Sequence, residues 1–392
     1  MNKPNIGIFT YDFYPFLGGQ GRHVYETYKR LKHNKDLNLY VFSPSQNNLK
    51  NHIVIFPKTR KSKLKDIIYS IKLNKVINTL IKTYNIDIAH LHGTIGGVFL
   101  LKKLDIPVIY TSYHTYVQQY RNLKNQRCKW ILRWVLSLLE KRSYKLADKI
   151  IAISNGTKQA IIIAYKIHFQ KVEVIPCGVN FGKFHKENSI KKIKNSLLFV
   201  GRLEERKGIK FLIETIPLVV NKRPDIKLSI VGKGKLLKKL KCFVRKNNLK
   251  ENIKFLGFVS DENLLKRYNE AELVIVPSVF EGFGITTIEA MACGTPVIAT
   301  NVDGIRDNIK NNENGILVEY GSKNELATQI IRLLNNTQLR KKIAEKGLKT
   351  VQNKFNLDEI AQKTFQIYNQ FLNKDDKNEH KLYIKENFFN KL

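Results

Sequence analysis

The chain has 392 residues, and its 68 Lys and Arg against 33 Asp and Glu give a net charge of +35. Hydrophobic residues make up 43% of the chain, enough for a folded core, so the composition excludes a disordered polyelectrolyte. At about 150 residues per domain, the length predicts two or three domains. Residues 1–200 carry +24, residues 201–250 carry +11, and residues 251–392 are neutral. This uneven distribution predicts an anionic partner for the N-terminal part.

Short apolar runs alternate with longer amphipathic stretches from one end of the chain to the other. A first series is predicted as strands at 5–9, 39–42, 86–91, 108–111, 149–153 and 172–175. A second series follows at 196–200, 227–231, 253–256, 273–276, 296–299 and 315–318. Helix-length stretches separate them, such as 21–32 and 208–220. The alternation predicts an α/β protein with two doubly wound domains, each a parallel sheet covered on both faces.

The boundary between the two series is marked by a stretch without periodicity at 176–195, which contains a proline, two glycines and a lysine cluster. Ligands in open α/β sheets bind beyond the carboxyl ends of strands, so two facing sheets predict a site in the cleft between the domains. We therefore expect an N-terminal domain at 1–187, a second domain at 188–355, a C-terminal helix at 356–372 that packs back on the first domain, and a polar tail at 373–392.

The cysteines and the N-terminus indicate a cytoplasmic protein. Cys128, Cys177, Cys242 and Cys293 lie far apart, with no CxxC pair and no histidine at metal-ligand spacing. Neither a disulfide framework nor a zinc site is predicted. The N-terminal apolar stretch is too short for a secretory signal, and no segment reaches the roughly 18 apolar residues that span a bilayer. Peripheral contact with the inner face of the membrane is compatible with these observations.

Glycines at 18, 19 and 21 follow the first predicted strand. They allow the backbone to approach a ligand, and the next helix offers free N–H groups to a phosphate. A nicotinamide cofactor is disfavoured, because Val24 stands where the third glycine of a dinucleotide fingerprint belongs. A βα loop without a ligand is the alternative.

Two basic residues, Arg202 and Lys207, follow the strand at 196–200. The planar fork of Arg and the point charge of Lys both suit a diphosphate. The alternative is a solvated helix start in which Glu204 and Glu205 compensate the charge.

Two glutamates lie in the stretch 276–300, where Glu281 follows a strand in a glycine-containing loop. A helix is predicted from about Ile285, and it ends at a glycine followed by a proline. Glu289 then lies about one turn inside this helix. The helix N-terminus can hold phosphate oxygens, Glu289 can accept hydrogen bonds from a diol such as ribose, and Glu281 can reach a sugar hydroxyl.

The chain resembles the retaining GT-B glycosyltransferases of family 4, glycosyl transferases group 1. The resemblance covers roughly residues 5–372 and rests on these blocks, in the family's order: LGGQGRHV, YTSYHT, ADKIIAISN, VEVIPCGVN, VGRLEERKG, FLGFVSDENL and EGFGITTIEAMACGTPVIATNVDGIRD. It implies two facing Rossmann-like domains with an interdomain cleft. The first domain would bind the acceptor and the second the nucleotide sugar.

The resemblance also implies roles for residues of the second domain. Glu281 resembles the first glutamate of the family's E-x7-E motif, which contacts the hydroxyls of the donor sugar. Glu289 resembles the residue that binds the nucleotide ribose. The amides of Phe283, Gly284 and Ile285 resemble those that bind the donor phosphates.

Five further residues are assigned in the same way. Arg202 and Lys207 resemble the pair that neutralises the diphosphate. Gly19 resembles the loop glycine close to donor and acceptor, and Gly18 beside it is assigned to the donor site. His114 resembles the family histidine near the donor sugar; a hydrogen-bonded structural histidine is the alternative. The expected catalytic set is thus Glu281, His114, Lys207 and Arg202.

These assignments predict transfer without a metal or cofactor. No D-x-D motif occurs, while Arg202, Lys207 and a helix N-terminus are available to stabilise the leaving diphosphate. The resemblance implies attack on the face from which the leaving group departs, with the donor phosphate helping to remove the acceptor proton. Glu281 would orient and stabilise the sugar without forming a covalent adduct. A GT-B sugar-nucleotide epimerase is the alternative enzyme.

The sequence leaves the substrates open. UDP-glucose, GDP-mannose and UDP-N-acetylglucosamine all fit as donors, and a glycan or a lipid-linked molecule fits as acceptor. Two basic stretches, 58–82 and 124–142, are candidate contacts with an anionic membrane surface, the second with Trp130 and Trp134. The alternatives are a solvated helix face for the first and a buried core helix for the second. A nucleic-acid-binding protein is the competing class, but no helix-turn-helix, RNA-binding aromatic signature or zinc finger occurs, so no nucleic-acid partner is expected.

Overall fold

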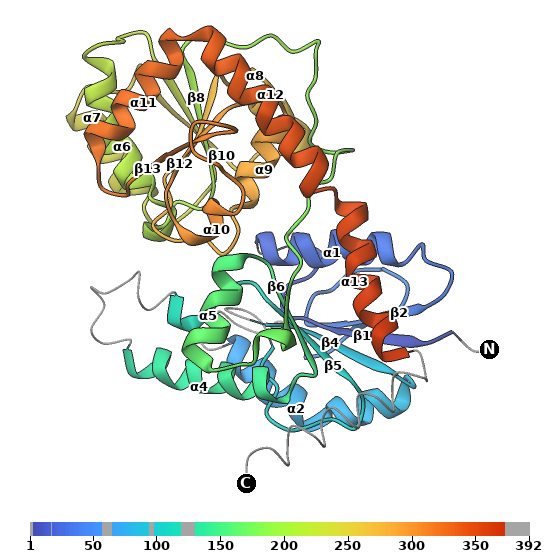
Figure 1. The fold of residues 1–392 in the computed structure, drawn as a ribbon. Helices are drawn as coiled ribbons and strands as arrows, with labels where there is room; N and C mark the ends of the chain where they lie inside the picture. Colours follow the sequence, from blue (N-terminus) through green and yellow to red (C-terminus); the bar gives the residue numbers. More distant parts are fainter. Residues whose placement is uncertain (1–2, 17, 57–64, 94–97, 119–129, 373–392) are drawn as a thin grey trace. The chain divides into compact units, whose positions relative to one another are not determined.

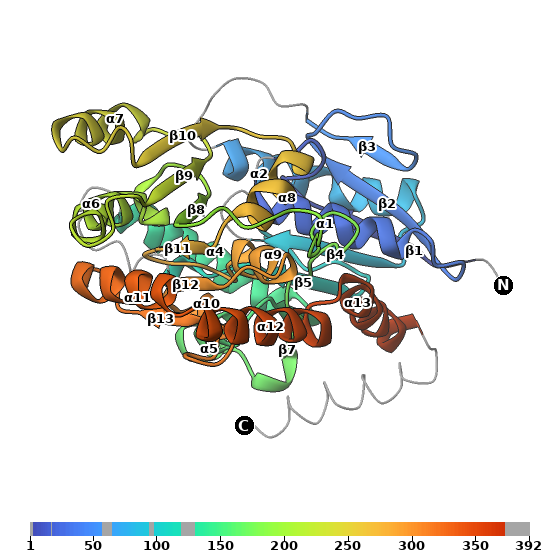
Figure 2. The ribbon, with the colours of Figure 1, turned by 90° about the horizontal axis from the view of Figure 1, so that it is seen from above.

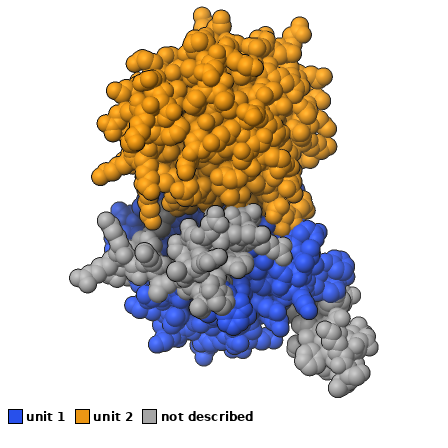
Figure 3. Space-filling view, turned by 90° about the vertical axis from the view of Figure 1, so that its left-hand side faces the viewer, with its two compact units in different colours: residues 1–153, 157–176, 357–392 blue, residues 154–156, 177–356 orange. Residues whose placement is uncertain are grey.

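The structure is a computed structural model that describes residues 3–16, 18–56, 65–93, 98–118 and 130–372 (Figure 1). The chain divides into two compact units, coloured separately in Figure 3. Unit 1 comprises residues 1–153, 157–176 and 357–392, and unit 2 comprises residues 154–156 and 177–356.

Unit 1 is built on a parallel sheet of seven strands in the order β3-β2-β1-β4-β5-β6-β7. The strands are β1 (Asn5–Phe9), β2 (Asn38–Ser43), β3 (His52–Val54), β4 (Ile88–Gly93), β5 (Val108–Ser112), β6 (Lys149–Ala152) and β7 (Val172–Val174). All but β3 correspond to strands predicted from the sequence. The prediction lacks this short edge strand, although residues 53–56 form an apolar run.

The helices of unit 1 pack their apolar residues onto this sheet. They are α1 (Gly19–Leu31), α2 (Lys65–Thr83), α4 (Trp130–Leu146), α5 (Asn155–Tyr165) and α13 (Leu357–Leu372). In α1, Val24, Tyr28 and Leu31 are buried at the spacing of three or four that forms one helix face. The last helix, α13, lies beside α1, and the Arg30 guanidinium pairs with Asp358 at 3.1 Å (Figures 1 and 2). Unit 1 therefore contains both the first and the last elements of the described chain, β1 and α13.

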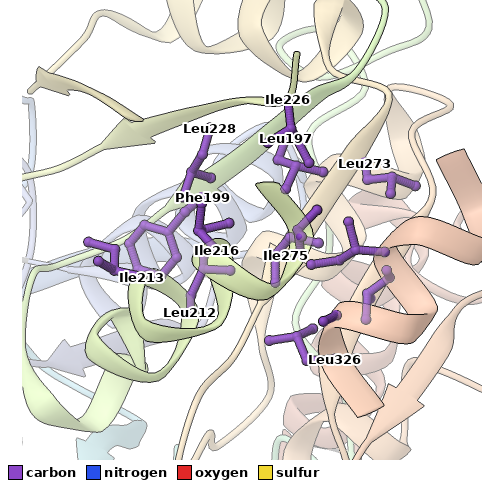
Figure 4. Close-up of a cluster of buried hydrophobic side chains, with 14 of the residues drawn as sticks. Leu197, Phe199, Leu212, Ile213, Ile216, Ile226, Leu228, Leu273, Ile275 and Leu326 are labelled. Carbon is purple, nitrogen blue, oxygen red and sulfur yellow. The ribbon is translucent and has the colours of Figure 1, made fainter. Parts of the chain in front are cut away.

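Unit 2 is built on a second parallel sheet, in the order β10-β9-β8-β11-β12-β13. Its strands are β8 (Ser196–Val200), β9 (Lys227–Val231), β10 (Ile253–Gly257), β11 (Leu273–Val276), β12 (Val297–Thr300) and β13 (Ile316–Val318). Its helices are α6 (Ile209–Val220), α7 (Leu237–Lys246), α8 (Asp261–Glu270), α9 (Ile285–Ala292), α10 (Asp303–Arg306), α11 (Lys323–Asn335) and α12 (Thr337–Lys354). Leu212, Ile213 and Ile216 of α6 pack against Phe199 and other buried residues of the sheet (Figure 4). The two doubly wound α/β domains predicted from the sequence are confirmed.

The chain passes from unit 1 to unit 2 at residue 177, whereas the sequence predicts a boundary after residue 187. The intervening segment packs on α8 of unit 2. Phe184 is fully buried with its ring edge-on to Tyr268, and the Asn269 side chain bonds the backbone of His185 and Glu187 at 3.0 and 2.9 Å. These contacts are made between residues about eighty positions apart, so the local sequence does not reveal them.

Within the described ranges, no helix has both the length and the apolar character needed to cross a bilayer.

Two buried histidines, His90 and His92, and the partly buried His23 interact with one another in unit 1. His90 and His92 lie on one face of β4 with ring centroids 4.2 Å apart. His90 Nδ1 lies 2.7 Å from the Tyr368 hydroxyl of α13, and its Nε2 lies 2.7 Å from the Thr111 hydroxyl. Burial lowers the pKa of His90 to about 3 and that of His23 to about 4, and it lowers the pKa of His92 well below 6.5. All three imidazoles are therefore neutral at pH 7.

This cluster predicts that the protein loses stability as the pH falls from 7 to 5. The unfolded chain binds protons at these histidines below pH 6.5 and the folded chain does not, so the free energy of unfolding decreases by about 2 kcal/mol for each histidine. In His92→Asn the free energy of unfolding should fall between pH 7 and pH 5 by about 2 kcal/mol less than in the wild type. Urea unfolding at both pH values measures this difference.

His33→Asn is the matched control, because His33 is exposed on the turn after α1. It should leave the pH dependence as it is in the wild type. Equal pH dependence in the wild type and His92→Asn would contradict the prediction.

Candidate functional site

The site lies where the loops after β8 and β11 meet in unit 2. These two strands are neighbours, but the chain moves to opposite sides after them, toward β9 in one case and β12 in the other. Such a switch point leaves the carboxyl ends of the two strands uncovered, and ligands of open α/β sheets bind there. The loops approach closely at Gly208, which has a φ of +64° and where a Cβ atom would lie 1.7 Å from the Pro277 carbonyl oxygen. Only glycine is compatible with this approach.

A buried carboxylate, that of Glu281, is the centre of the site. The Lys207 ammonium and the Ser278 hydroxyl both donate to its Oε1, the hydroxyl at 2.8 Å. The Arg206 guanidinium donates to its Oε2 at 3.2 Å and also to the Phe280 carbonyl oxygen at 3.1 Å. The side chain is 6% exposed. The loop after β8 and the loop after β11 are therefore joined by two ion pairs.

These partners determine the charge of Glu281. Burial by itself would raise its pKa, but Lys207 and Arg206 outweigh burial and lower the pKa to about 2. Burial lowers the pKa of Lys207, and the attraction of Glu281 acts against that change. Glu281 is thus a carboxylate throughout the neutral range, and its lone pairs are already engaged by three donors.

Of the predicted basic pair, only Lys207 contacts Glu281 in the structure, and the second basic contact is made by Arg206. Arg202 is exposed, with its guanidinium 3.5 Å from Glu204. Sequence reasoning missed Arg206, because it reads as part of a solvated helix start. The available signal was Gly208, which ends a short 3-10 turn at Glu205–Lys207 and turns Arg206 and Lys207 toward the neighbouring loop.

The first turn of α9 follows Glu281 directly. Gly284 is its N-cap residue and has a φ of +83°, a conformation that favours glycine. The Asn308 side-chain amide donates to the Phe283 carbonyl at 2.5 Å and to the Thr287 hydroxyl at 3.0 Å. The amides of Phe283, Gly284 and Ile285 lie at this rigid end, where helix geometry supplies no intrahelical acceptor. The turn is suited to bind an anion such as phosphate.

Glu289 lies one turn further along α9 and is 7% exposed. The Tyr268 hydroxyl of α8 donates to its Oε2 at 2.9 Å, which orients the carboxylate. Tyr268 is fully buried, and its carbonyl oxygen accepts the Thr295 hydroxyl at 2.6 Å. Sequence reasoning did not find Tyr268, because it lies in a different helix and in no motif.

The remaining predicted residues belong to unit 1. Gly18 and Gly19 begin α1, and Asp12 fixes this turn by accepting the Gly21 amide at 3.1 Å. A Cβ atom at Gly21 would lie 2.5 Å from the Asp12 carboxyl group, so that close packing requires glycine. His114 is half-buried in the loop after β5. Gly18, Gly19 and His114 thus follow the strands β1 and β5 at their carboxyl ends.

In the ranges that the structure describes, no three His, Cys, Asp or Glu side chains cluster as metal ligands would. The absence of a metal requirement stays a prediction.

Comparison with known proteins agrees with this architecture. Two family models match, Glycosyl transferases group 1 over residues 180–350 and Glycosyltransferase Family 4 over residues 17–183. An uncharacterized glycosyltransferase of Methanocaldococcus jannaschii is 31% identical over 91% of this chain and 96% of its own. UDP-Gal:α-D-GlcNAc-diphosphoundecaprenol α-1,3-galactosyltransferase of Escherichia coli is 27% identical over 76% of this chain and 81% of its own. Sucrose-phosphate synthase from Thermosynechococcus elongatus has the same fold, with a TM-score of 0.78 at 23% identity over 94% of this chain and 99% of that one.

The fold and these similarities define a GT-B enzyme that transfers sugars. The chain belongs to the glycosyl transferases group 1, the family 4 glycosyltransferases.

The geometry predicts a large effect of substitutions at the central ion pairs. We expect Glu281→Ala or Lys207→Ala to lower the turnover number at least about a hundredfold, the scale of losing one contact to developing charge in the transition state. The measurement is release of nucleoside diphosphate from a panel of nucleotide sugars by each purified variant.

Glu272→Gln is the matched control. Glu272 is another buried carboxylate of unit 2, which binds Arg340 at 2.6 Å and the Asn195 amide at 2.7 Å. This variant should lose thermal stability and keep its turnover number. Near wild-type transfer by Glu281→Ala would contradict the assignment of the site.

Proposed function

We propose that the protein is a retaining glycosyltransferase that moves a hexose or N-acetylhexosamine from a nucleotide-diphosphate sugar to a glycan or lipid-linked acceptor. The observation that carries this proposal is the convergence of Glu281, Lys207, Arg206 and the N-terminus of α9 at one switch point. Two cations and a helix N-terminus provide the positive potential that a diphosphate requires. The nearby carboxylates of Glu281 and Glu289 provide acceptors for sugar and ribose hydroxyls.

The leaving group determines the main chemical task. The bond between the anomeric carbon and the phosphate oxygen breaks, and its electron pair stays on the diphosphate. Lys207, with Arg202 and Arg206 on the same loop, stabilises this negative charge together with the amides of α9. The acceptor oxygen bonds the anomeric carbon on the face that the diphosphate leaves. Its proton passes to the departing phosphate oxygen.

The state of Glu281 supports an orienting role over a covalent one. A nucleophilic carboxylate needs a free lone pair directed at the anomeric carbon. Glu281 instead accepts hydrogen bonds from Lys207, Arg206 and Ser278, and its pKa of about 2 makes it a weak nucleophile. A carboxylate has about four lone-pair sites, so the one that remains can accept a sugar hydroxyl while the others keep the two cations in position.

The same charges support the proposal of transfer without a metal. A divalent cation would neutralise the diphosphate, but two buried or half-buried basic residues and a helix N-terminus already supply that charge. The sequence also lacks a D-x-D motif. A GT-B epimerase would use a similar donor site, and it is distinguished by its product.

A thermal-shift screen tests the identity of the donor, and analysis of the reaction product tests the stereochemistry of transfer. We expect one nucleotide sugar among UDP-glucose, UDP-galactose, UDP-N-acetylglucosamine and GDP-mannose to raise the melting temperature selectively, because it binds the folded state alone. With an acceptor glycan, the anomeric configuration of the product, read by NMR, should equal that of the donor. Excess EDTA should leave the rate unchanged.

Lys342→Ala offers a control, because Lys342 is exposed on α12 of unit 2. It should show the same ligand shift as the wild type. An inverted product, dependence on a divalent cation, or an epimerised nucleotide sugar without transfer would each contradict the proposed mechanism.

The acceptor side of the proposal rests on unit 1. The matched Escherichia coli relative is named for transfer to a diphosphoundecaprenol-linked sugar. The surface of unit 1 supports a similar lipid-linked acceptor here, because Trp134, Val135 and Leu138 of α4 are 58%, 40% and 45% exposed. A helix that only filled the core would not expose these three side chains.

The neighbouring helix α2 extends this apolar surface. Ile68 and Ile71 are 44% and 46% exposed, while Ile67 packs with Leu136 and Leu139 of α4 in a shared apolar cluster. Exposed basic residues flank both helices: Lys72 and Lys75 on α2, and Arg142 and Lys145 on α4. Apolar side chains flanked by cations are the composition of a surface that binds anionic lipid on the cytoplasmic face. Residues 58–64, 124–129 and the side chain of Trp130 lie outside the described parts of the chain.

Liposome cosedimentation tests this surface. We expect more protein to sediment with vesicles of anionic phospholipid than with neutral vesicles. The double variant Trp134→Ser and Leu138→Ser should lower the bound fraction several-fold, because it removes apolar area from the surface.

Phe258→Ser is the matched control, since Phe258 is 79% exposed but belongs to unit 2. It should bind vesicles as the wild type does. Equal sedimentation with anionic and neutral vesicles would contradict membrane binding.

A further inference from the structure

A further buried carboxylate, that of Glu140 in unit 1, lies outside the site already described. Glu140 is on the inner side of α4 and has no exposed surface. Its Oε1 accepts the Tyr144 hydroxyl at 3.0 Å. Its Oε2 accepts the Tyr116 amide at 2.9 Å and also the Tyr165 hydroxyl. One carboxylate thus joins α4 and α5 to the loop after β5.

The loop that Glu140 holds contains His114. Tyr116 lies two residues after His114, and its amide is bound directly. Ser112 lies two residues before His114, and its hydroxyl is 2.7 Å from that of Tyr144, which in turn donates to Glu140. Glu140 is therefore connected to the chain on both sides of His114.

The far end of the loop is fixed independently of Glu140. The Gln118 side-chain oxygen accepts the Thr115 amide at 3.0 Å, and the Thr115 hydroxyl accepts the Gln118 amide at 3.1 Å. These bonds close a turn over residues 115–118. The orientation of that turn relative to β5 depends on further contacts, which include those at Ser112 and Tyr116 and the Tyr113 hydroxyl, 3.0 Å from His92 Nδ1.

The loss of stability that comes with burying this carboxyl group indicates a role for Glu140 beyond packing. Burial raises the pKa of Glu140 to about 7, although its three hydrogen-bond donors act in the opposite direction. A carboxyl group without exposed surface lowers stability relative to an apolar residue of similar size. An apolar residue could fill the space, but it could not accept the Tyr116 amide.

We propose that Glu140 is a positioning residue that fixes the backbone on both sides of His114 and so determines where its imidazole lies. The proposal rests on the proposed function and on the role that the family resemblance implies for His114, which is a place beside the donor sugar. Misplacing a substrate-contacting group by about 1 Å is enough to reduce turnover strongly. The nucleotide is held by residues of unit 2, so its binding does not depend on this loop.

The test uses Glu140→Leu, which fills the space and removes the acceptor. We expect the kcat for nucleoside diphosphate release with acceptor to fall about tenfold to a hundredfold. The KM for the donor should change less than about twofold, because the nucleotide contacts are unaffected. Glu140→Gln should restore most of the activity, since its one carbonyl oxygen can accept the Tyr116 amide while its NH₂ group meets the Tyr144 hydroxyl.

A double-mutant cycle with His114→Ala separates positioning from a general loss of structure. If Glu140 acts through His114, Glu140→Leu should change kcat less than about twofold in the His114→Ala background. An equal loss in both backgrounds overturns the inference. A fully active His114→Ala instead overturns the proposed role of His114, so the two failures are distinguishable.

Two further variants complete the design. Asp148→Asn is the matched control, because Asp148 accepts the Val108 amide at 2.7 Å at the opposite end of β5. It should lower the melting temperature and keep kcat. If Glu140→Leu does not fold, Tyr144→Phe removes the hydroxyl that connects Glu140 to Ser112 and leaves the Tyr116 amide on Glu140, and it should lower kcat in the wild type but not in His114→Ala. An unchanged kcat in Tyr144→Phe would then overturn the inference.

Discussion

The pairing of one buried carboxylate with two cations organises unit 2. A charged group can be buried only when partners replace its water, and removing one partner leaves an uncompensated charge. Glu281 therefore requires Lys207 and Arg206 within reach, although they lie more than seventy residues earlier in the chain. That requirement fixes the distance between the loops after β8 and β11, and Gly208 allows it. The same loops lead into α6 and α9, so the helix N-terminus and the basic residues are held in one arrangement.

The fold was largely predictable from the sequence. Buried parallel strands are short apolar runs, and in the helices between them apolar residues recur every three or four positions. The short edge strand β3 was missed although residues 53–56 are an apolar run, because periodicity alone does not distinguish a strand from a buried helix segment in so short a run. Within the candidate site, motifs point to Glu281, Lys207 and Glu289, and their roles stay predictions. Arg206 and Tyr268 were not found, because their importance arises from contacts with residues far away in the sequence.

The composition of helix α4 alone does not distinguish a buried core helix from a helix at a membrane-binding surface. Its apolar residues extend almost around the helix, which favoured a buried core helix. The structure shows that Leu136 and Glu140 face inward, whereas Trp134, Val135 and Leu138 are exposed. A buried carboxylate and an exposed tryptophan on one helix reverse the usual placement of polar and apolar residues. Both exceptions lie in unit 1, where the excess of positive charge is also largest.

The position of α13 affects the order in which the protein is completed on the ribosome. Apart from residues 154–156, unit 2 is one continuous segment, whereas unit 1 begins with β1 and ends with α13. Domains fold as units while the chain emerges from its N-terminus. All of unit 2 emerges before Tyr368 reaches His90 and Asp358 reaches Arg30. The unit whose synthesis starts first is thus the last to become complete, and until then the site that α13 covers on β4 and α1 is available to chaperones.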